Sequence, residues 1–531
     1  MTTDKPLYAQ IIECNFNKNI MYKSSLSIFN VFKIRLILFL FGLLVISCGD
    51  DSTSNDPGAD GTSITSFKFL PTENPSLGTG ELMEIKDEEI IGRLPIYVKM
   101  ENLVARFEHT GAEVMVSNIP QISGKTPNDF TKTLNYTVKS KNGETRVYAV
   151  NLDRFTGLPI VHINTLGSQA IDSKDDYREG SIQIDGNTLY ANSQNSEMKI
   201  RGRGNSTWWV HPKKPYQLNF PEKTEMLGMP KDKKWIFLAE YSDKTLLRNR
   251  IAFEMGYMSK LDWTPQCVFA EVMVNNAYMG TYNITQKVEE SDYRVSLGDN
   301  GYLLEIDQLD RLDPDDVYFR TGSFLINIKE PSLTAESTAF LYIKDLINQF
   351  ENTLYSDNFK DQLNGYQKYI DLDSFIDWYL ISEISKNQDS KDFSSIFLNV
   401  LPGEKIKMGP LWDFDLAFGN VDYSDATNPT GFWVKDHKWY SRLFQDPYFV
   451  SLVKERFNYF RQNESLILEK IDEQSNYLKW AQEENDKKWN LLGNYVWPNP
   501  VVFNTYQEEV DHLKSWYMDR MDWLETAYNA L

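Results

Sequence analysis

Cysteine and histidine are scarce in this sequence. Its 531 residues include three cysteines, at positions 14, 48 and 267, and five histidines. Two of the cysteines lie in or beside the N-terminal segment, so the rest of the chain can build neither a disulfide framework nor a thiolate metal cluster. The histidines show no HExxH spacing. A zinc hydrolase and a Ser-His-Asp hydrolase are therefore poor candidates.

Positive charge is also in short supply. The chain has 55 Lys and Arg against 75 Asp and Glu, a net charge of −20. Nucleic acids and anionic lipid surfaces bind basic proteins, so we expect no nucleic-acid partner. The hydrophobic content of 41% and aromatic content of 14% are typical of a globular protein.

The chain contains one apolar run, and it is short. Leu36 to Ile46 is eleven residues long, whereas a helix needs about 20 to span a bilayer. Lys33 and Arg35 precede it, a pattern that predicts a secretory signal over residues 1–48, with Met21 as an alternative start. The following LVISC resembles a bacterial lipobox, which predicts lipidation of Cys48. An ordinary export signal with an incidental cysteine is the alternative.

Residues 49–65 are rich in Ser, Thr, Asn, Asp and Gly, a composition that predicts a flexible tether. Its acidic start, Gly49-Asp50-Asp51, resembles surface-export signals of Gram-negative lipoproteins. We therefore expect an outer-membrane lipoprotein of the cell envelope, exposed at the surface. Its contact with the membrane would be through the lipid anchor only.

The folded part divides into two regions. Residues 66–158 read as short strands separated by turns, including a hairpin across Asn142-Gly143, which predicts a small Ig-like β-sandwich. Residues 159–531 read as strands followed by helices, with a helix predicted within 332–357, and this order predicts an α+β domain.

Three stretches of the second region carry candidate functional residues. The first, KIRGRGNSTW followed by KKPYQLNF, combines Gly202, Gly204 and Asn205 with a basic rim that includes Lys213 and Lys214. Glycines let backbone N–H groups approach an anion closely, and a strand lysine after such a loop is how kinases hold phosphates. A hairpin with a solvated basic rim is the alternative.

The second stretch, DKTLLRNRIAFE, predicts a helix that begins near Asp243 and carries Arg248. The third begins with a helix that leads to Asp389, continues through a hairpin, and ends at GPLWDFDLAFGN. If this last segment is a strand, Asp413 and Asp415 face one way while the neighbouring aromatic residues anchor the other face. A loop carboxylate and a carboxylate pair suit phosphoryl transfer with Mg²⁺, although structural ion pairs also bury acids.

These motifs occur together in one order. With NAYMGTYNITQKVE and GYLLEID, they resemble the CotH family, the spore-coat-protein-H-like kinases with an atypical protein-kinase fold, from Pro159 to at least Phe457. The resemblance implies a strand-rich N-lobe and a helical C-lobe. It also implies a reaction that transfers phosphate from ATP, with Mg²⁺ or Mn²⁺, to Ser or Thr of a secreted or surface protein.

The resemblance implies roles for single residues. Asp389 matches the catalytic base and Asp413 the metal-binding aspartate, while Lys214, with Lys213 as its rival, matches the phosphate-contacting lysine. Glu305 matches a position near the nucleotide. The supporting candidates are Asp415, as a second metal ligand, and Arg248, Asn205, Gly202 and Gly204, near the nucleotide.

The chain departs from ordinary kinases in two respects. It has no HRD tripeptide, and Ser394 stands where the second metal ligand, five residues after the base, is usually Asn. Either Asp415 supplies that ligand or a single metal binds. We expect a monomer that acts on a protein phosphoacceptor. The alternatives are a non-catalytic surface adhesion protein that binds a surface ligand and, third, a two-carboxylate glycosidase.

Overall fold

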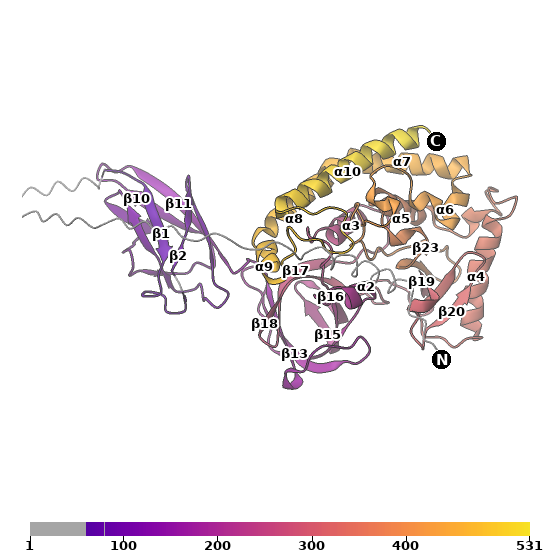
Figure 1. Ribbon diagram of the computed structural model, residues 1–531, viewed down its shortest axis with the longest axis horizontal. Coiled ribbons are helices and arrows are strands. Elements are labelled where there is room, and N and C mark those ends of the chain that lie inside the picture. The colour runs from indigo at the N-terminus through magenta and orange to yellow at the C-terminus, as the bar shows by residue number, and fades with distance from the viewer. Residues whose placement is uncertain (1–59, 79) are drawn as a thin grey trace, which may run out of the picture. The chain divides into compact units, whose positions relative to one another are not determined.

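The computed structural model describes residues 60–78 and 80–531 (Figure 1). The predictions of a signal segment, a lipidated Cys48 and most of the tether fall on residues outside these ranges. Among the described residues, no helix is long and apolar enough to cross a membrane.

The first region forms two main β-sheets around an aromatic core. Strands β2, β1 and β6 make one sheet, β3-β4-β11-β10-β7-β8 make the other, and β5 pairs with β9. The strands are β1 (Ile64–Phe69), β2 (Glu81–Leu82), β3 (Glu84–Lys86), β4 (Glu89–Leu94), β5 (Leu103–Val104), β6 (Arg106–His109), β7 (Glu113–Val116), β8 (Ile119–Pro120), β9 (Pro127–Asn128), β10 (Leu134–Lys139) and β11 (Thr145–Arg154).

The core of this region follows from the alternation of its strands. Phe67 of β1 and Tyr136 of β10 are both fully buried, and their rings meet edge to face with centroids 5.2 Å apart. The predicted hairpin between β10 and β11 is confirmed, since Gly143 takes the positive φ of +86° that this turn requires.

The second region begins with a closed barrel, drawn in magenta and pink in Figure 1, of order β12-β13-β14-β15-β16-β18-β17. Parallel pairing of β12 with β17 closes it. The strands are β12 (Ile160–Thr165), β13 (Arg178–Asp185), β14 (Ser196–Gly202), β15 (Tyr216–Met226), β16 (Met229–Leu238), β17 (Cys267–Val274) and β18 (Ala277–Gln286). Helix α2 (Ser206–Val210) links β14 to β15, and α3 (Arg248–Tyr257) lies between β16 and β17.

A five-stranded sheet and a set of helices follow the barrel. The sheet has the order β20-β21-β19-β22-β23. Its strands are β19 (Tyr302–Asp307), β20 (Val317–Arg320), β21 (Leu325–Glu330), β22 (Ile396–Val400) and β23 (Lys407–Met408). The helices are α4 (Thr338–Leu354), α5 (Leu372–Ile384), α6 (Lys438–Leu443), α7 (Pro447–Gln462), α8 (Glu464–Tyr477), α9 (Lys479–Trp489) and α10 (Tyr506–Asn529).

Helix α5 is the centre of the helical part. From Ser374 to Ile384 all of its residues are buried, because it contacts α7, α10 and strand β23. Trp378 of α5 stacks on Tyr440 of α6 with ring centroids 5.8 Å apart. The mixed α+β class predicted from the sequence is confirmed. The position of α5 fixes the place where the chain emerges toward Asp389.

Candidate functional site

The GPLWDFDLAFGN segment follows β23 but is not a strand. Asp413 has φ of +67°, in the left-handed region, so the extended backbone is interrupted there. Trp412 and Phe414 are nonetheless buried, while Asp413 and Asp415 are half-buried. The predicted separation of aromatic from acidic side chains is confirmed, and the predicted strand is wrong.

Three of the predicted acids lie close enough to repel one another. Asp389 begins a short 3-10 helix, η4 (Asp389–Lys391), just beyond α5. Burial and the charge of Asp413 raise the pKa of Asp389 to about 7. Burial, followed by Asp413, also raises the pKa of Asp415 well above its ordinary value. The structure thus brings these three carboxyl groups, predicted from separate positions along the chain, into one place.

The cation that faces these acids is Arg203. It follows Gly202 at the end of β14, and its guanidinium group lies 5.2 Å from the ring centroid of Trp412. Burial lowers the pKa of Arg203 to about 10, while the charges of Asp413 and Glu305 oppose that change. Arg203 therefore stays protonated at neutral pH, and its charge partly offsets that of the acids.

The ammonium group of Lys214 has different partners. It donates to the carbonyl oxygens of Trp208 at 2.5 Å and His211 at 2.6 Å, at the C-terminal end of α2. Lys213 is fully buried and donates to Asn485 Oδ1 of α9 at 2.9 Å. In this structure neither lysine is placed with Asp413, and a phosphate contact for either stays a prediction.

The glycines of the basic loop fit close packing around α2. A Cβ on Gly202 would lie 2.2 Å from the Trp208 ring, and Gly204 has φ of +84°. Asn205 directly precedes α2, and its Oδ1 accepts a hydrogen bond of 3.2 Å from Lys174. These residues fix the backbone beside Arg203.

Arg248 contacts the backbone of the segment that contains Asp413 and Asp415. Its guanidinium group forms an ion pair with Asp243 and donates from Nε to the carbonyl oxygen of Ala417 at 3.1 Å. Asp243 is not the residue before α3, as the sequence predicted, because the helix begins at Arg248. It still caps the helix, since its Oδ2 accepts the Arg248 N–H at 2.8 Å.

Glu305 lies on β19, opposite Phe397 of β22. Burial raises its pKa to about 7, and Lys329 Nζ lies 3.5 Å from its Oε2. Arg311 lowers the pKa of Asp389 and donates to Ser394 Oγ at 2.6 Å. Ser394, the departure from the kinase pattern, is thus held by an arginine.

The donor set at Asp413 fits a divalent cation bound together with phosphates. Within residues 60–78 and 80–531, no group of three or more His, Cys, Asp or Glu could hold a metal alone. The Asp413 carboxylate accepts one long hydrogen bond, 3.4 Å from Ser395 Oγ, and lies beside two further acids. Magnesium commonly binds one or two carboxylates, with waters and substrate phosphates as its other ligands.

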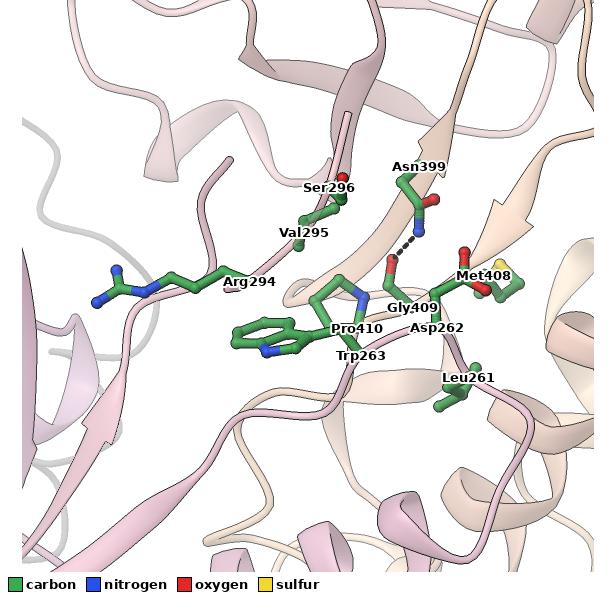
Figure 2. Close-up of a pocket in the computed structure, with 10 residues that line it drawn as sticks. All are labelled: Leu261, Asp262, Trp263, Arg294, Val295, Ser296, Asn399, Met408, Gly409 and Pro410. Carbon is green, nitrogen blue, oxygen red and sulfur yellow. Dashed lines mark hydrogen bonds between the residues drawn. The ribbon is translucent and has the colours of Figure 1, made fainter. Parts of the chain in front are cut away.

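Two cavities adjoin these elements. Figure 2 shows one of about 170 Å³, where Pro410 lies beside Trp263 and the Asn399 amide bonds to the Gly409 carbonyl oxygen. None of the predicted site residues lines it. Another cavity, of about 290 Å³, is lined by residues that include Asp307, the last residue of β19, and Asp392. This second cavity offers space beside the Asp389 loop.

The fold and site together define an α+β protein with a half-buried carboxylate cluster faced by an arginine. A sequence model of the CotH kinase protein family matches residues 200–524, more than half of the chain. The chain belongs to the CotH kinase family, which suggests a kinase-like protein.

Comparisons with other known proteins add little. Among curated proteins, none matches this chain. A "putative secreted protein" from Bacteroides fragilis is 15% identical, covers 18% of this chain and 95% of its own, and has a TM-score of 0.13. A "putative glycoside hydrolase" from Bacteroides thetaiotaomicron is 13% identical, covers 55% of this chain and 89% of its own, and has a TM-score of 0.14.

Sequence reasoning left several residues out of the site. Arg203 and Arg311 act on the acids through charge, and Lys329 pairs with Glu305. Arg203 stands in the basic loop, so its charge was a usable signal. Asn249 and Asn387, whose side chains contact the backbone beside Asp413, lie within the recognised motifs but carry no charge that would single them out.

Proposed function

We propose that this protein is an ATP-dependent kinase that phosphorylates Ser or Thr of another protein. The observation that carries the proposal is the placing together of Asp389, Asp413 and Asp415 opposite Arg203, in a chain of the CotH kinase family. This membership favours a kinase over the binding-protein alternative.

Asp389 suits the role of general base. Its pKa of about 7 lies near the working pH, where a carboxylate is both ionised and able to accept a proton. The acceptor hydroxyl oxygen forms a bond to the γ-phosphorus, the bond from that phosphorus to the β-phosphate oxygen breaks, and the hydroxyl proton passes to Asp389.

Asp413 and Asp415 are the residues that would hold Mg²⁺ or Mn²⁺. When bound, that cation would neutralise phosphate charge during the transfer. Arg203 is placed to share this neutralisation, because a guanidinium group stays charged and matches the geometry of phosphate oxygens.

The location of the protein is part of the proposal. Lipidation at Cys48 would anchor residues 60–531 to the outer membrane through the tether, with the β-sandwich of residues 66–158 as an Ig-like spacer before the kinase domain of residues 159–531. The phosphoacceptor would be a secreted or surface protein, and the kinase itself a monomer.

The direct test is incubation of the full chain with ATP and Mg²⁺ or Mn²⁺ and candidate acceptor proteins. Mass spectrometry should detect phosphate on Ser or Thr of this protein or of an added acceptor, and ATP with metal should raise the melting temperature. Absence of both transfer and the thermal shift would contradict the proposal.

Substitutions at Arg203 and at Lys214, the lysine predicted from the sequence, test which of the two contacts the phosphates of ATP. We expect Arg203→Ala to lower kcat/KM for ATP about 100-fold, because one preorganised charged donor at a reacting phosphate is worth about that much. Lys214→Met should have a much smaller effect, since the Lys214 ammonium group already donates to two carbonyl oxygens. Steady-state kinetics of both variants checks this, and the reverse order of effects would return phosphate binding to Lys214.

A further inference from the structure

The peptide unit that joins Asp413 to Phe414 is held from both sides by asparagine side chains. Asn387 donates from Nδ2 to the carbonyl oxygen of Asp413 at 3.0 Å. The N–H of Phe414 donates to Oδ1 of Asn249 at 2.8 Å. Because both polar groups of one rigid peptide plane are paired, the plane cannot rotate without losing both hydrogen bonds.

This peptide plane controls where the Asp413 carboxylate points. Asp413 has φ of +67°, a conformation that residues other than glycine seldom adopt and that persists only where the surroundings hold it. Rotation about the Cα–C bond of Asp413 turns the peptide plane relative to the side chain. A plane fixed at its oxygen and at its nitrogen therefore restrains ψ of Asp413, and with it the direction in which the Cα–Cβ bond leaves the backbone.

Asn249 is itself anchored. Its Nδ2 lies 3.2 and 3.1 Å from the two carboxylate oxygens of Glu240, which also accepts from Asn283 of β18 at 3.2 Å. Asn249 is 2% exposed and Glu240 is 4% exposed, so water competes little for these bonds. We call Asn249 and Asn387 together the asparagine clamp. Through Glu240 and Asn283, the Asn249 side of this clamp is connected to barrel strand β18.

Asn387 is anchored in the helical part. Its N–H donates to the carbonyl oxygen of Ser382 at 3.0 Å, and its own carbonyl oxygen accepts from Trp433 Nε1 at 3.0 Å. Asn387 is also 2% exposed. The two asparagines therefore connect two elements far apart in the sequence, β18 and the end of α5, to one peptide plane.

We propose that Asn249 and Asn387 are positioning residues that hold the Asp413 carboxylate in the orientation required to bind the divalent cation. The inference rests on the proposed function, because it assigns to Asp413 the metal contact of a kinase. Neither asparagine touches a reacting atom, and each acts through the backbone of Asp413. Partners that orient a metal ligand typically change metal affinity by 10- to 100-fold when removed.

The test measures binding rather than turnover. Calorimetric titration of the full chain with ADP, with and without Mn²⁺, gives the metal-dependent part of the affinity. For Asn387→Ala we expect the Mn²⁺-dependent affinity for ADP to fall about 10- to 100-fold, while the affinity for ADP without metal stays at the wild-type value. Asn387→Leu, which keeps the volume and lacks the donor, should behave in the same way.

A second variant, at Asn249, tests whether the two asparagines of the asparagine clamp act together on the same peptide plane. Asn249→Ala should give a similar loss, and the double variant should lose little more than the larger single loss, because either change frees the same peptide plane. Since Asn249→Ala also removes donors from Glu240, the two Asn387 variants decide the outcome where the two residues disagree.

Asn74→Ala is the matched control. Asn74 is a buried asparagine of the β-sandwich whose amide donates to Val104 O at 2.9 Å and whose Oδ1 accepts from Val104 N at 2.8 Å. It should lower the melting temperature without changing Mn²⁺-dependent binding.

The titrations distinguish failure of the proposed function from failure of the inference about the asparagines. If the wild-type chain binds no ADP with Mn²⁺, the proposed function fails and the inference fails with it. If the wild-type chain binds but the Asn387 variants bind equally well, or lose binding only to the extent that they unfold, the asparagines are structural and the inference alone is overturned.

Discussion

Replacing Asp413 by Asn should abolish phosphate transfer and leave the protein at least as stable as before. The expected loss of activity is about 1,000-fold or more, because the cation would lose one of the charged ligands assigned to it. Asparagine is nearly isosteric and tolerates a left-handed backbone better than most residues, so the φ of +67° is retained. The change also removes the negative charge that raises the pKa values of Asp389 and Asp415.

Thermal melting and transfer assays on the same preparation check this pair of effects. If Asp413 served only packing, its replacement would lower both the melting temperature and the activity. If Asp413 is a functional residue that costs stability, its replacement should lower the activity and raise the melting temperature or leave it unchanged. Asp373→Asn is the matched control, since this acid on α5 pairs at the surface with Lys260. Activity retained in Asp413→Asn would exclude Asp413 as the metal ligand.

The same assays settle whether Asp415 is a second ligand. If two metals bind, Asp415→Asn should lose activity to a degree comparable with Asp413→Asn, and metal titration should show one site fewer. If one metal binds, Asp415→Asn should keep the metal stoichiometry and leave the pKa of Asp389 near its wild-type value, because burial and Asp413, not Asp415, raise that pKa.

Local patterns in the sequence predicted the elements that position the site. The apolar spacing within 332–357 predicted α4, and the helix lies within that range, at Thr338–Leu354. The hairpin predicted between Asp389 and Asp413 is formed by β22 and β23, which pair antiparallel. Helical periodicity and turn residues are local signals, so they survive in any context that buries the apolar face.

Features that depend on distant parts of the chain were not predictable in this way. The parallel pairing of β12 with β17 that closes the barrel joins strands about a hundred residues apart, and no local pattern specifies it. The strand expected at Asp413 is interrupted by a left-handed residue that two asparagines from other elements hold. Which of Arg203 and Lys214 lies toward Asp413 also depends on tertiary contacts, since both belong to one basic stretch.

The second large expected effect is a loss of stability on removing a buried arginine that holds residues 425–431, which follow Asp413 and Asp415 in the chain. Residues 425–431 form few backbone hydrogen bonds of their own, and two buried cations satisfy their carbonyl oxygens instead. Lys386 donates to the carbonyl oxygens of Asp425, Asn428 and Thr430 at 2.6, 2.9 and 2.7 Å, and Arg520 of α10 donates to those of Pro429 and Gly431 at 2.8 and 2.7 Å.

Arg520 also forms a buried ion pair with Glu383 of α5. The two charged groups lie 2.5 Å apart, and both side chains are fully buried. The Glu383 carboxylate accepts the N–H groups of Trp433 and Lys435, each at 2.7 Å. The pair therefore ties α5, α10 and the segment between them together at one point.

We expect Arg520→Met to destabilise the protein by about 3–5 kcal/mol. The methionine fills much of the volume, but Glu383 is left as a buried carboxylate without its cation and two carbonyl oxygens lose their donors. Guanidinium denaturation followed by tryptophan fluorescence measures the change, because Trp433 and Trp523 both contact the buried pair.

Arg461→Met is the matched control, because it removes an arginine that contacts carboxylates but is partly exposed. Arg461 of α7 contacts three carboxylates, Glu464, Asp522 and Glu525, but its side chain is 26% exposed. Water replaces most of what such a pair contributes, so the loss should be about 1 kcal/mol or less. Equal losses in the two variants would mean that the number of carboxylate contacts, and not burial, sets the contribution of these arginines. A smaller loss for Arg520→Met would show that the helical part holds the 425–431 segment without the buried pair.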